Sequence, residues 1–203
     1  MNTLRYFLAL FLVITLPPLF LYWLLIHPLI SFWRAQGLAL TYAVVLTIIG
    51  LAMIGLFSVR HYLLAADYGT HYPLLVCGAL LLILSSVMRF SIQQHLDIKT
   101  LLGLPEIAPE HFPRTLITSG IYARLRHPRY LQFMIALAGY ALIANNLASY
   151  LAVGLWLPGI HVIVRLEERE LRDHFGRAYE DYCRGVPRFI PRLRSSRKNM
   201  REA

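Results

Sequence analysis

The sequence predicts an all-α integral membrane protein, a helical bundle of about five transmembrane helices followed by an amphipathic helix on the cytoplasmic side. Hydrophobic residues make up 57% of the 203 residues and charged residues only 15%, whereas soluble domains carry roughly 25% charged residues. Apolar segments of about 20 residues, the length that spans a bilayer as a helix, recur along the chain. Basic residues are concentrated in the C-terminal half, as in a protein with one cytoplasmic face.

The N-terminal half, residues 1–90, predicts three transmembrane helices within a single membrane domain of residues 1–203. Their apolar runs extend from about Leu4 to Ile26, from Leu38 to Val59 and from Tyr72 to Phe90. The first run is longer than the roughly 7–15 apolar residues of a signal peptide, so we expect it to be a membrane helix.

The C-terminal half predicts a long polar loop, a helical hairpin and an amphipathic helix. The loop extends from about Ser91 to Arg129, and the hairpin has arms at Tyr130–Ala144 and Leu147–Val164 with a turn at Asn145-Asn146. The stretch from Arg165 to Tyr182 has helical spacing of its apolar residues, which favours a helix on the membrane surface. The apolar face of this helix contains Leu171, Phe175, Ala178, Tyr179 and Tyr182.

Charge distribution predicts the orientation and the partners of the chain. Only Arg5, Arg34 and Arg60 precede residue 88, and the other Lys and Arg residues lie between Arg89 and Arg201. Five spans place the N-terminus and the C-terminal tail on opposite sides, with the basic loop and the tail together in the cytoplasm. The tail lacks a recognisable nucleic-acid module, so we expect membrane lipids as partners and no nucleic acid.

The densest cluster of polar groups extends from Gly120 to Tyr130, where the loop re-enters the membrane. Pro128 suits a first helical turn, which places Arg126 and His127 at the mouth of the next helix. Charged groups beside an apolar helix are costly unless they are paired or lie in a wet cavity, which favours a functional site. The alternative is membrane anchoring, with arginines at lipid headgroups and tyrosines in the interface belt.

A second cluster, Arg165 to Leu171, follows the predicted fifth span directly and contains Glu167 and Glu168. Acidic residues near a helix C-terminus are disfavoured by the helix dipole, so a positive partner is expected. Arg126 lies on the same side of the membrane and is a candidate for this partner. The alternative is a solvated run with local pairs, such as Glu168 with Arg172 at i, i+4.

Several other kinds of site are disfavoured by the motifs. The histidines have no metal-site spacing, and there is no dinucleotide fingerprint or phosphate loop, so we expect no metal and no Rossmann fold. The two cysteines, Cys77 and Cys183, are too few and too isolated for a disulfide framework or a zinc cluster.

Read together, the two clusters and the residues after them resemble the isoprenylcysteine carboxyl methyltransferase family over residues 112–192. The motifs that carry the resemblance, in order, are Leu116-Ile117-Thr118-Ser119-Gly120-Ile121-Tyr122, Arg126-His127-Pro128-Arg129-Tyr130, Asn145, Glu167-Glu168, Phe175-Gly176, Tyr179, Tyr182 and Val186-Pro187. The resemblance implies a methyltransferase embedded in the membrane that uses S-adenosyl-L-methionine from a cytoplasm-facing pocket.

The resemblance also implies roles for particular residues. The residues expected to line the cofactor pocket are Tyr122, His127, Pro128, Arg129 and Tyr130. Backbone contacts are expected from the stretch Arg114, Thr115, Leu116 and Ile117. Glu167 would bind the cofactor or orient the site, and Arg126 would hold an anionic group of the substrate, so these two are the expected catalytic residues. Arg165 is a weaker candidate for substrate binding.

The expected substrate is a lipophilic small molecule or a lipidated one, such as an isoprenylcysteine-type carboxylate. Two other interpretations remain open: an NADPH-dependent reductase of sterol or isoprenoid double bonds, and a non-catalytic membrane protein of the same fold. Binding of S-adenosylmethionine, NADPH or neither discriminates among the three.

Overall fold

The computed structural model of the chain describes residues 2–26, 28–94 and 115–191. Apart from an isolated bridge between Asp67 and Asn146, the regular structure in these residues is helical. The first half contains α1 (Thr3–Ile26), α2 (Ile30–Gln36), α3 (Leu38–Ser58), α4 (Arg60–Leu63) and α5 (Tyr72–Gln93). The second half contains η1 (Gly120–Ala123), α8 (Pro128–Ala144), α9 (Leu147–Phe175) and α10 (Arg177–Gly185).

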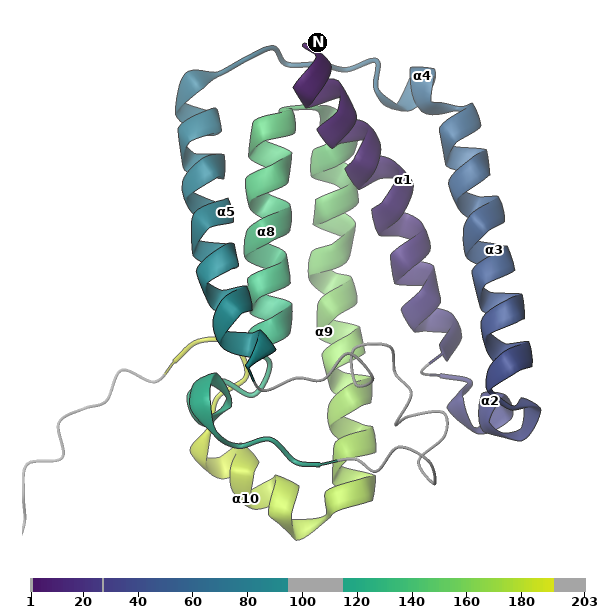
Figure 1. The fold of residues 1–203 in the computed structure, drawn as a ribbon, viewed down its shortest axis with the longest axis vertical. Coiled ribbons are helices and arrows are strands. Elements are labelled where there is room, and N and C mark those ends of the chain that lie inside the picture. Colours follow the sequence, from purple (N-terminus) through teal and green to yellow (C-terminus); the bar gives the residue numbers. More distant parts are fainter. Residues whose placement is uncertain (1, 27, 95–114, 192–203) are drawn as a thin grey trace, which may run out of the picture.

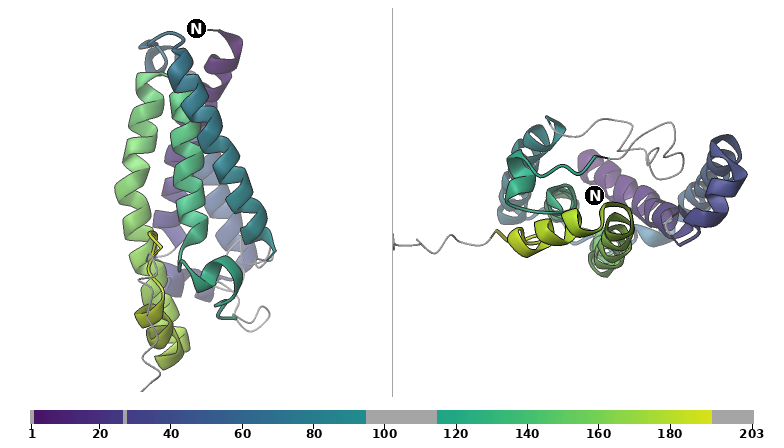
Figure 2. Two further views of the ribbon diagram at one scale, coloured as in Figure 1. Left: turned by 90° about the vertical axis from the view of Figure 1, so that its left-hand side faces the viewer. Right: turned by 90° about the horizontal axis from the view of Figure 1, so that it is seen from below.

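The long helices run side by side and form a bundle with two distinct ends (Figure 1). The N-terminus, α4 and the turn between α8 and α9 lie at the upper end of that view, whereas α2, η1 and α10 lie at the lower end. The two further views in Figure 2 show the same arrangement. Helix η1, from the polar segment before α8, and helix α10, from the segment after α9, therefore share one end of the bundle, as the sequence predicted.

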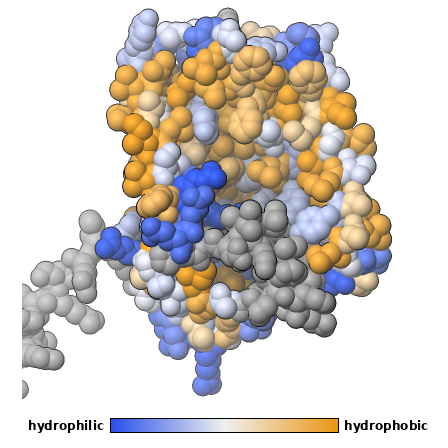
Figure 3. Space-filling view, viewed as in Figure 1, coloured by the Kyte–Doolittle hydropathy of each residue, from blue (hydrophilic) through white to orange (hydrophobic). Residues whose placement is uncertain are grey.

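The apolar side chains divide between a buried core and an exposed outer surface. Trp156, Ile160 and Val164 of α9 pack with Leu12 and Leu16 of α1 in the main core. The outer faces of α3 and α5 expose many large hydrophobic side chains, and apolar residues cover much of the side of the bundle in Figure 3. Such a surface is stable in lipid and costly in water, so the chain is an all-α membrane protein.

Four of the described helices, α1, α3, α5 and α9, are long and apolar enough to cross a membrane. The fifth predicted span corresponds to α8, which has 17 residues and packs against α5, α1 and α9. Gly78 of α5 and Gly139 of α8 bring these helices together: a Cβ added at Gly78 would lie 2.7 Å from the carbonyl oxygen of Gly139. Close approach of helices through small residues is typical of membrane bundles.

The predicted boundary between the last span and a separate amphipathic helix at Arg165 is wrong. Helix α9 continues for 29 residues from Leu147 to Phe175, and the break comes at Gly176, whose φ is 53° and ψ is −127°. Glycine adopts this conformation without the steric strain that a side chain adds. Helix α10 then folds back beneath η1 (Figure 1), so the predicted apolar face is divided between two helices.

A network around Arg5 joins three segments at the upper end of the bundle. The Arg5 side chain is 3% exposed and forms an ion pair with Asp67. Its Nε and Nη2 donate to the carbonyl oxygen of Ala144 at 3.2 and 3.0 Å, and Nη2 also donates to that of Asn145 at 3.2 Å. Arg5 therefore satisfies carbonyls that the end of α8 leaves free.

The turn at Asn145-Asn146 was predicted correctly, and its conformation explains both asparagines. Asn145 has φ 45°, in the left-handed region that asparagine tolerates better than most residues. The Asn146 side chain accepts a hydrogen bond from the backbone N–H of Ala148 at 3.0 Å, which caps the start of α9. The Asn145 side chain donates to Gly69 at 2.9 Å, so the turn is also fixed to the segment before α5.

Candidate functional site

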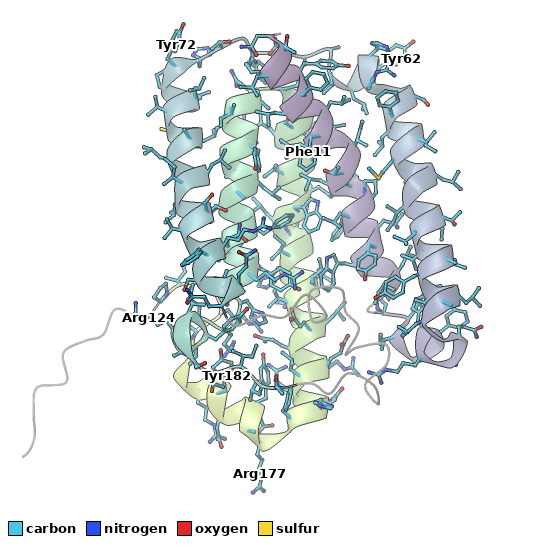
Figure 4. The ribbon with its side chains drawn as sticks, viewed as in Figure 1. Phe11, Tyr62, Tyr72, Arg124, Arg177 and Tyr182 are labelled. Carbon is cyan, nitrogen blue, oxygen red and sulfur yellow. The ribbon has the colours of Figure 1, made fainter. Side chains whose placement is uncertain are left out.

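The polar side chains at the lower end of the bundle converge from four segments. These are η1, the start of α8, the last three turns of α9, and the segment Val186–Phe189 after α10, which we call the strap. Figure 4 shows Arg124, Tyr182 and Arg177 at this end, and Tyr62 and Tyr72 at the opposite end. The Arg-His-Pro motif and the Glu-Glu pair, about 40 residues apart in sequence, lie together here.

Backbone hydrogen bonds hold the strap against the start of α8. The N–H of Arg126 donates to the carbonyl of Pro187 at 2.9 Å, and the N–H of His127 donates to that of Arg188 at 3.1 Å. His127 precedes the first residue of α8, Pro128, whose missing N–H costs nothing at this position. The strap thus fixes the backbone of the Arg-His pair where it enters the bundle.

Glu168 is the buried centre of the site. Its side chain is fully buried, and its Oε1 lies 3.0 Å from Nη2 of Arg126 and 3.2 Å from Nε2 of His127. Arg188 of the strap donates two hydrogen bonds to the same carboxylate, at 2.9 and 2.6 Å. Arg172, one turn further along α9, adds a contact at 3.3 Å. A buried carboxylate requires such partners, because removing an unpaired ion from water costs about several kcal/mol.

These contacts also fix the charge of the strap. The hydrogen bonds from Arg188 to Glu168 raise the pKa of the Arg188 guanidinium above its ordinary value, so the strap arginine stays charged. The side chain of Arg126 also fixes the start of the strap to the end of α10. Its Nη1 donates to the carbonyl oxygens of Cys183 and Val186 at 2.9 and 3.0 Å.

Glu167, the neighbour of Glu168, is in a different environment. Its side chain is 28% exposed, and its Oε2 lies 3.8 Å from Nδ1 of His127. That oxygen is buried and has no hydrogen-bond partner within the part of the chain that the structure describes. The Nε of Arg126 is also buried and lacks a partner among those residues. Buried polar atoms are seldom left unsatisfied, so these two atoms are candidates for contact with a ligand.

Aromatic side chains surround the two acidic residues. The Tyr130 ring is buried, 5.9 Å from the His127 ring and 6.2 Å from that of Trp23 on α1, and Phe189 of the strap lies 6.1 Å from His127. Tyr182 of α10 donates to the carbonyl oxygen of Tyr122 at 2.6 Å. Burial raises the pKa of Tyr182 to about 12, so its hydroxyl remains a donor and ties α10 to η1.

Tyr122 lies close to two of the other predicted site residues. Burial raises the pKa of its hydroxyl, and the charge of Glu167 adds to this effect while that of Arg129 opposes it. Tyr122 therefore stays neutral at physiological pH, within electrostatic range of both groups.

The length of α9 places the acidic pair at the membrane surface. The helix has 29 residues, and at about 1.5 Å per residue it is about 44 Å long. The hydrocarbon core of a bilayer is only about 30 Å thick. About 20 residues from Leu147 suffice to cross it, so Glu167 and Glu168 lie where the helix leaves the hydrocarbon. Charged groups are tolerated at this depth, and the partly exposed Glu167 is open to a lipid headgroup or a water-soluble molecule there.

The structure brings together most of the residues predicted for the site, but not all of them. Tyr122, Arg126, His127, Arg129, Tyr130 and Glu167 share the lower end, and Thr115, Leu116 and Ile117 lie in the non-helical segment before η1. Arg114 lies outside the described residues. Arg165 is exposed, and two residues of α-helix turn it by about 200° from Glu167, to the opposite side of α9.

Two residues of the site were not assigned a role from the sequence, namely Glu168 and Arg188. The expectation that Arg126 compensates the acidic cluster is confirmed, with Glu168 as its partner. The signal for Glu168 was its position beside Glu167 at the end of an apolar helix. Arg188 has no comparable signal, because a basic residue in a basic tail is not distinctive.

Residues 74–178 match the phospholipid methyltransferase family. This range contains most of α5 and all of η1, α8 and α9, and with them Arg126, His127 and the two glutamates. The chain belongs to this family. The strap lies outside the matched range.

Six curated relatives of the chain are named as methyltransferases, and three of them illustrate the similarity. Protein-S-isoprenylcysteine O-methyltransferase of Schizosaccharomyces pombe is 39% identical over 77 residues, which are 37% of this chain and 33% of that protein. Methanethiol S-methyltransferase 2 of Bradyrhizobium diazoefficiens is 39% identical over 82 residues, 40% of this chain and 30% of that protein. Protein-S-isoprenylcysteine O-methyltransferase B of Arabidopsis thaliana is 36% identical over 78 residues, 37% of this chain and 39% of that protein.

The similarity to these relatives is therefore partial. It covers between 30% and 39% of the length of each of the three relatives. No solved structure matches the chain. The resemblance to isoprenylcysteine carboxyl methyltransferases is supported by the names of these relatives, and it concerns the half of the chain that contains the site.

Proposed function

We propose that this chain is a membrane-embedded methyltransferase that uses S-adenosyl-L-methionine and methylates a lipophilic substrate at the cytoplasmic surface. The observation that carries the proposal is the buried Oε2 of Glu167 beside His127, which has no hydrogen-bond partner among the described residues. Glu167 lies within the residues that match the family. A buried carboxylate oxygen without a hydrogen-bond donor favours a ligand that is cationic.

The side chains around Glu167 fit the chemical groups of the cofactor. S-adenosylmethionine supplies an electrophilic methyl group on a sulfonium, and it also has an ammonium and a carboxylate. Carboxylates and aromatic faces, here those of Glu167, Tyr122 and Tyr130, suit the cations. Arg129 at the first turn of α8 suits the carboxylate. We assign cofactor binding to these residues with His127 and Pro128, and backbone contacts to Arg114, Thr115, Leu116 and Ile117.

The substrate would reach the site from the bilayer surface. Arg126 is the proposed anchor for an anionic group of the substrate, because its Nε is buried without a partner among the described residues while its other nitrogens are fixed. Arg165 lies on the opposite face of α9 and is the weaker candidate. The chain's part in the reaction is to hold the nucleophile and the methyl carbon in line, which supplies much of the rate.

The cytoplasmic orientation rests on the positive-inside rule. At the lower end the described arginines include Arg124, Arg126, Arg129, Arg165, Arg169, Arg172, Arg177, Arg184 and Arg188. At the upper end they include Arg5 and Arg60. A reporter fused to the C-terminus should be active in the cytoplasm, and activity only outside it would contradict the orientation.

Binding of radiolabelled S-adenosylmethionine to the detergent-purified chain tests the cofactor directly. We expect saturable binding that NADPH does not displace. Displacement by NADPH would favour a reductase, and no binding by folded protein would favour a non-catalytic protein of the same fold.

Methyl transfer then identifies the substrate class. The names of the relatives and of the family suggest three substrate classes: an isoprenylated cysteine with a free carboxylate, methanethiol, and a phospholipid. We expect transfer to a lipophilic one of these, with methanethiol inactive. Transfer to methanethiol alone would contradict the lipophilic substrate while leaving the cofactor assignment intact.

A further inference from the structure

We propose that the outer face of α9 binds the phosphate of an anionic phospholipid through Arg165 and Arg169. Each of these residues lies two positions from Glu167 in sequence, and therefore about 200° from it around the helix. The surface is thus separate from the candidate site. The proposal goes beyond the proposed function, because it requires neither the cofactor nor the substrate.

The outer face of α9 changes from apolar to basic along one stripe. Helix α9 lies at the edge of the bundle in both views of Figure 2. Its side chains Leu151, Leu155 and Val162 are 64%, 50% and 46% exposed. Arg165 and Arg169 are also exposed. At 100° per residue, the other four side chains all lie within about 40° of Leu151 around the helix. One exposed stripe therefore leads from apolar side chains to two arginines.

The position of the arginines along α9 matches the depth of lipid phosphates. The helix begins at Leu147, and at about 1.5 Å per residue Arg165 and Arg169 lie about 27 and 33 Å along it. The hydrocarbon core of a bilayer is about 30 Å thick, and the headgroups lie just outside it. The two arginines therefore flank the boundary between hydrocarbon and headgroups, while the apolar part of the stripe lies beside the lipid chains.

The charges of these arginines are not neutralised by the described part of the chain. Within it, the side chains of Arg165 and Arg169 form no ion pair and no hydrogen bond. Arg172, next on the same face, contacts Glu168 at 3.3 Å, and the exposed Asp173 offsets one charge at most. Like charges four residues apart destabilise a helix. An anion that contacts both arginines removes this repulsion.

The chemistry of the stripe favours a phospholipid as the source of that anion. The guanidinium group of arginine donates two parallel hydrogen bonds to a phosphate. Side chains four residues apart on a helix are neighbours, with Cβ atoms about 5–6 Å apart, so Arg165 and Arg169 reach the same phosphate. The apolar stripe beside them accommodates the chains of a lipid, which a soluble phosphate lacks. A zwitterionic lipid is less suitable, because its own cation competes with the arginines.

Native mass spectrometry of the detergent-purified chain tests this surface. The chain is titrated with phosphatidylglycerol, with phosphatidylcholine, and with glycerol 3-phosphate, which has the phosphate without the chains. We expect the wild-type chain to bind phosphatidylglycerol most tightly of the three. Each arginine near an anionic lipid strengthens binding about fivefold. The double variant Arg165→Gln/Arg169→Gln should therefore bind phosphatidylglycerol roughly 25-fold more weakly, with little change for phosphatidylcholine.

A matched control removes the same charge from α10. Arg177 extends from the lowest point of the molecule in Figure 4. The Arg184 side chain is 77% exposed and pairs with Asp181. The double variant Arg177→Gln/Arg184→Gln should bind phosphatidylglycerol within about threefold of wild type, less than the effect of one arginine at the lipid. Circular dichroism and the thermal midpoint check that both variants are folded.

Three results would overturn the proposal. Equal loss of phosphatidylglycerol binding in the two double variants would show that the lipid responds to net charge and not to the outer face of α9. Equal affinity of the wild-type chain for phosphatidylglycerol and phosphatidylcholine would show that the surface does not select an anionic lipid. Binding of glycerol 3-phosphate as tight as that of phosphatidylglycerol would assign the arginines to a soluble phosphate.

Discussion

Among the described residues, each end of the bundle has one fully or almost fully buried charged side chain, and the hydrogen-bond networks around these two side chains differ in whether they are complete. Arg5 at the upper end is 3% exposed and Glu168 at the lower end is fully buried. Arg5 distributes its three nitrogens among Asp67, Thr70 and the carbonyls that end α8. At the lower end, the centre is equally well partnered, but Glu167 and Arg126 each keep a buried atom without a partner among the described residues.

This difference separates a structural network from a site. A network in which each donor meets an acceptor stabilises the fold and has no remaining capacity for a ligand. A network that is complete at its centre and incomplete at its edge is rigid and can still bind. We therefore expect substitutions at the upper end to change stability alone. Substitutions at the lower end should change binding, and some of them should change stability as well.

Removing the centre of the lower network should have the largest effect. Glu168→Ala leaves Arg126, Arg188 and His127 without their shared carboxylate, and breaking a buried ion pair costs about 3–5 kcal/mol. We expect a large fall in the thermal midpoint of unfolding in detergent and loss of cofactor binding. A midpoint within the error of the wild-type value would show that this carboxylate does not hold the site together.

Removing the centre of the upper network should have a smaller effect, confined to stability. Arg5→Met retains a long side chain but leaves the carbonyls of Ala144 and Asn145 unpaired, which should cost about 2 kcal/mol. Asp67 is 22% exposed and can be solvated in the variant. Cofactor affinity, measured by calorimetry below the midpoint, should stay within twofold of wild type. A tenfold loss of affinity would couple the two ends and contradict the comparison.

The upper network should also weaken in acid. Burial opposes ionisation of Asp67, but the hydrogen bonds from Arg5 and Gly69 outweigh it and lower its pKa below the ordinary 3.8. A lowered pKa contributes stability that is present above the unfolded value and is lost as pH falls through the folded value. The difference in thermal midpoint between wild type and Asp67→Asn should be constant near neutral pH, shrink below about pH 5 and vanish in stronger acid. A difference that grows in acid would contradict this sign.

A polar contact between the two networks should matter least. Gln132 of α8 donates to Ser85 of α5 at 2.6 Å, and such contacts in membrane bundles contribute about 0.6 kcal/mol on average. Gln132→Leu should therefore lower the midpoint by a degree or two, roughly as expected for a chain of this size. A larger loss, or loss of cofactor binding, would place Gln132 in the site.

Most of the fold could be predicted from hydropathy, because each membrane helix is a local property of about 20 residues. The predicted spans agree closely with α1, α3 and α5. The end of α9 could not be found in this way, since the apolar spacing continues across Gly176 into α10. Only the conformation of Gly176 shows that two helices share that face.

The sequence was sufficient to predict which segments form the site, but not which of the two adjacent glutamates is buried in it. Glu167 and Glu168 are adjacent, about 100° apart around the helix, and the face that points inward depends on tertiary packing. The link from Arg188 to Glu168 spans 20 residues and requires the break at Gly176, which returns the chain to α8. The roles of the predicted residues in binding stay predictions.

The central claim is that the lower end binds the cofactor and the upper end only stabilises the fold. One paired measurement tests it most directly: the thermal midpoint and the S-adenosylhomocysteine affinity of Glu167→Gln and Arg5→Met, compared with wild type. We predict that Glu167→Gln binds S-adenosylhomocysteine at least about tenfold more weakly than wild type and has the wild-type thermal midpoint. Arg5→Met should bind with wild-type affinity and have a lower thermal midpoint. Equal affinity in wild type and Glu167→Gln would contradict the claim.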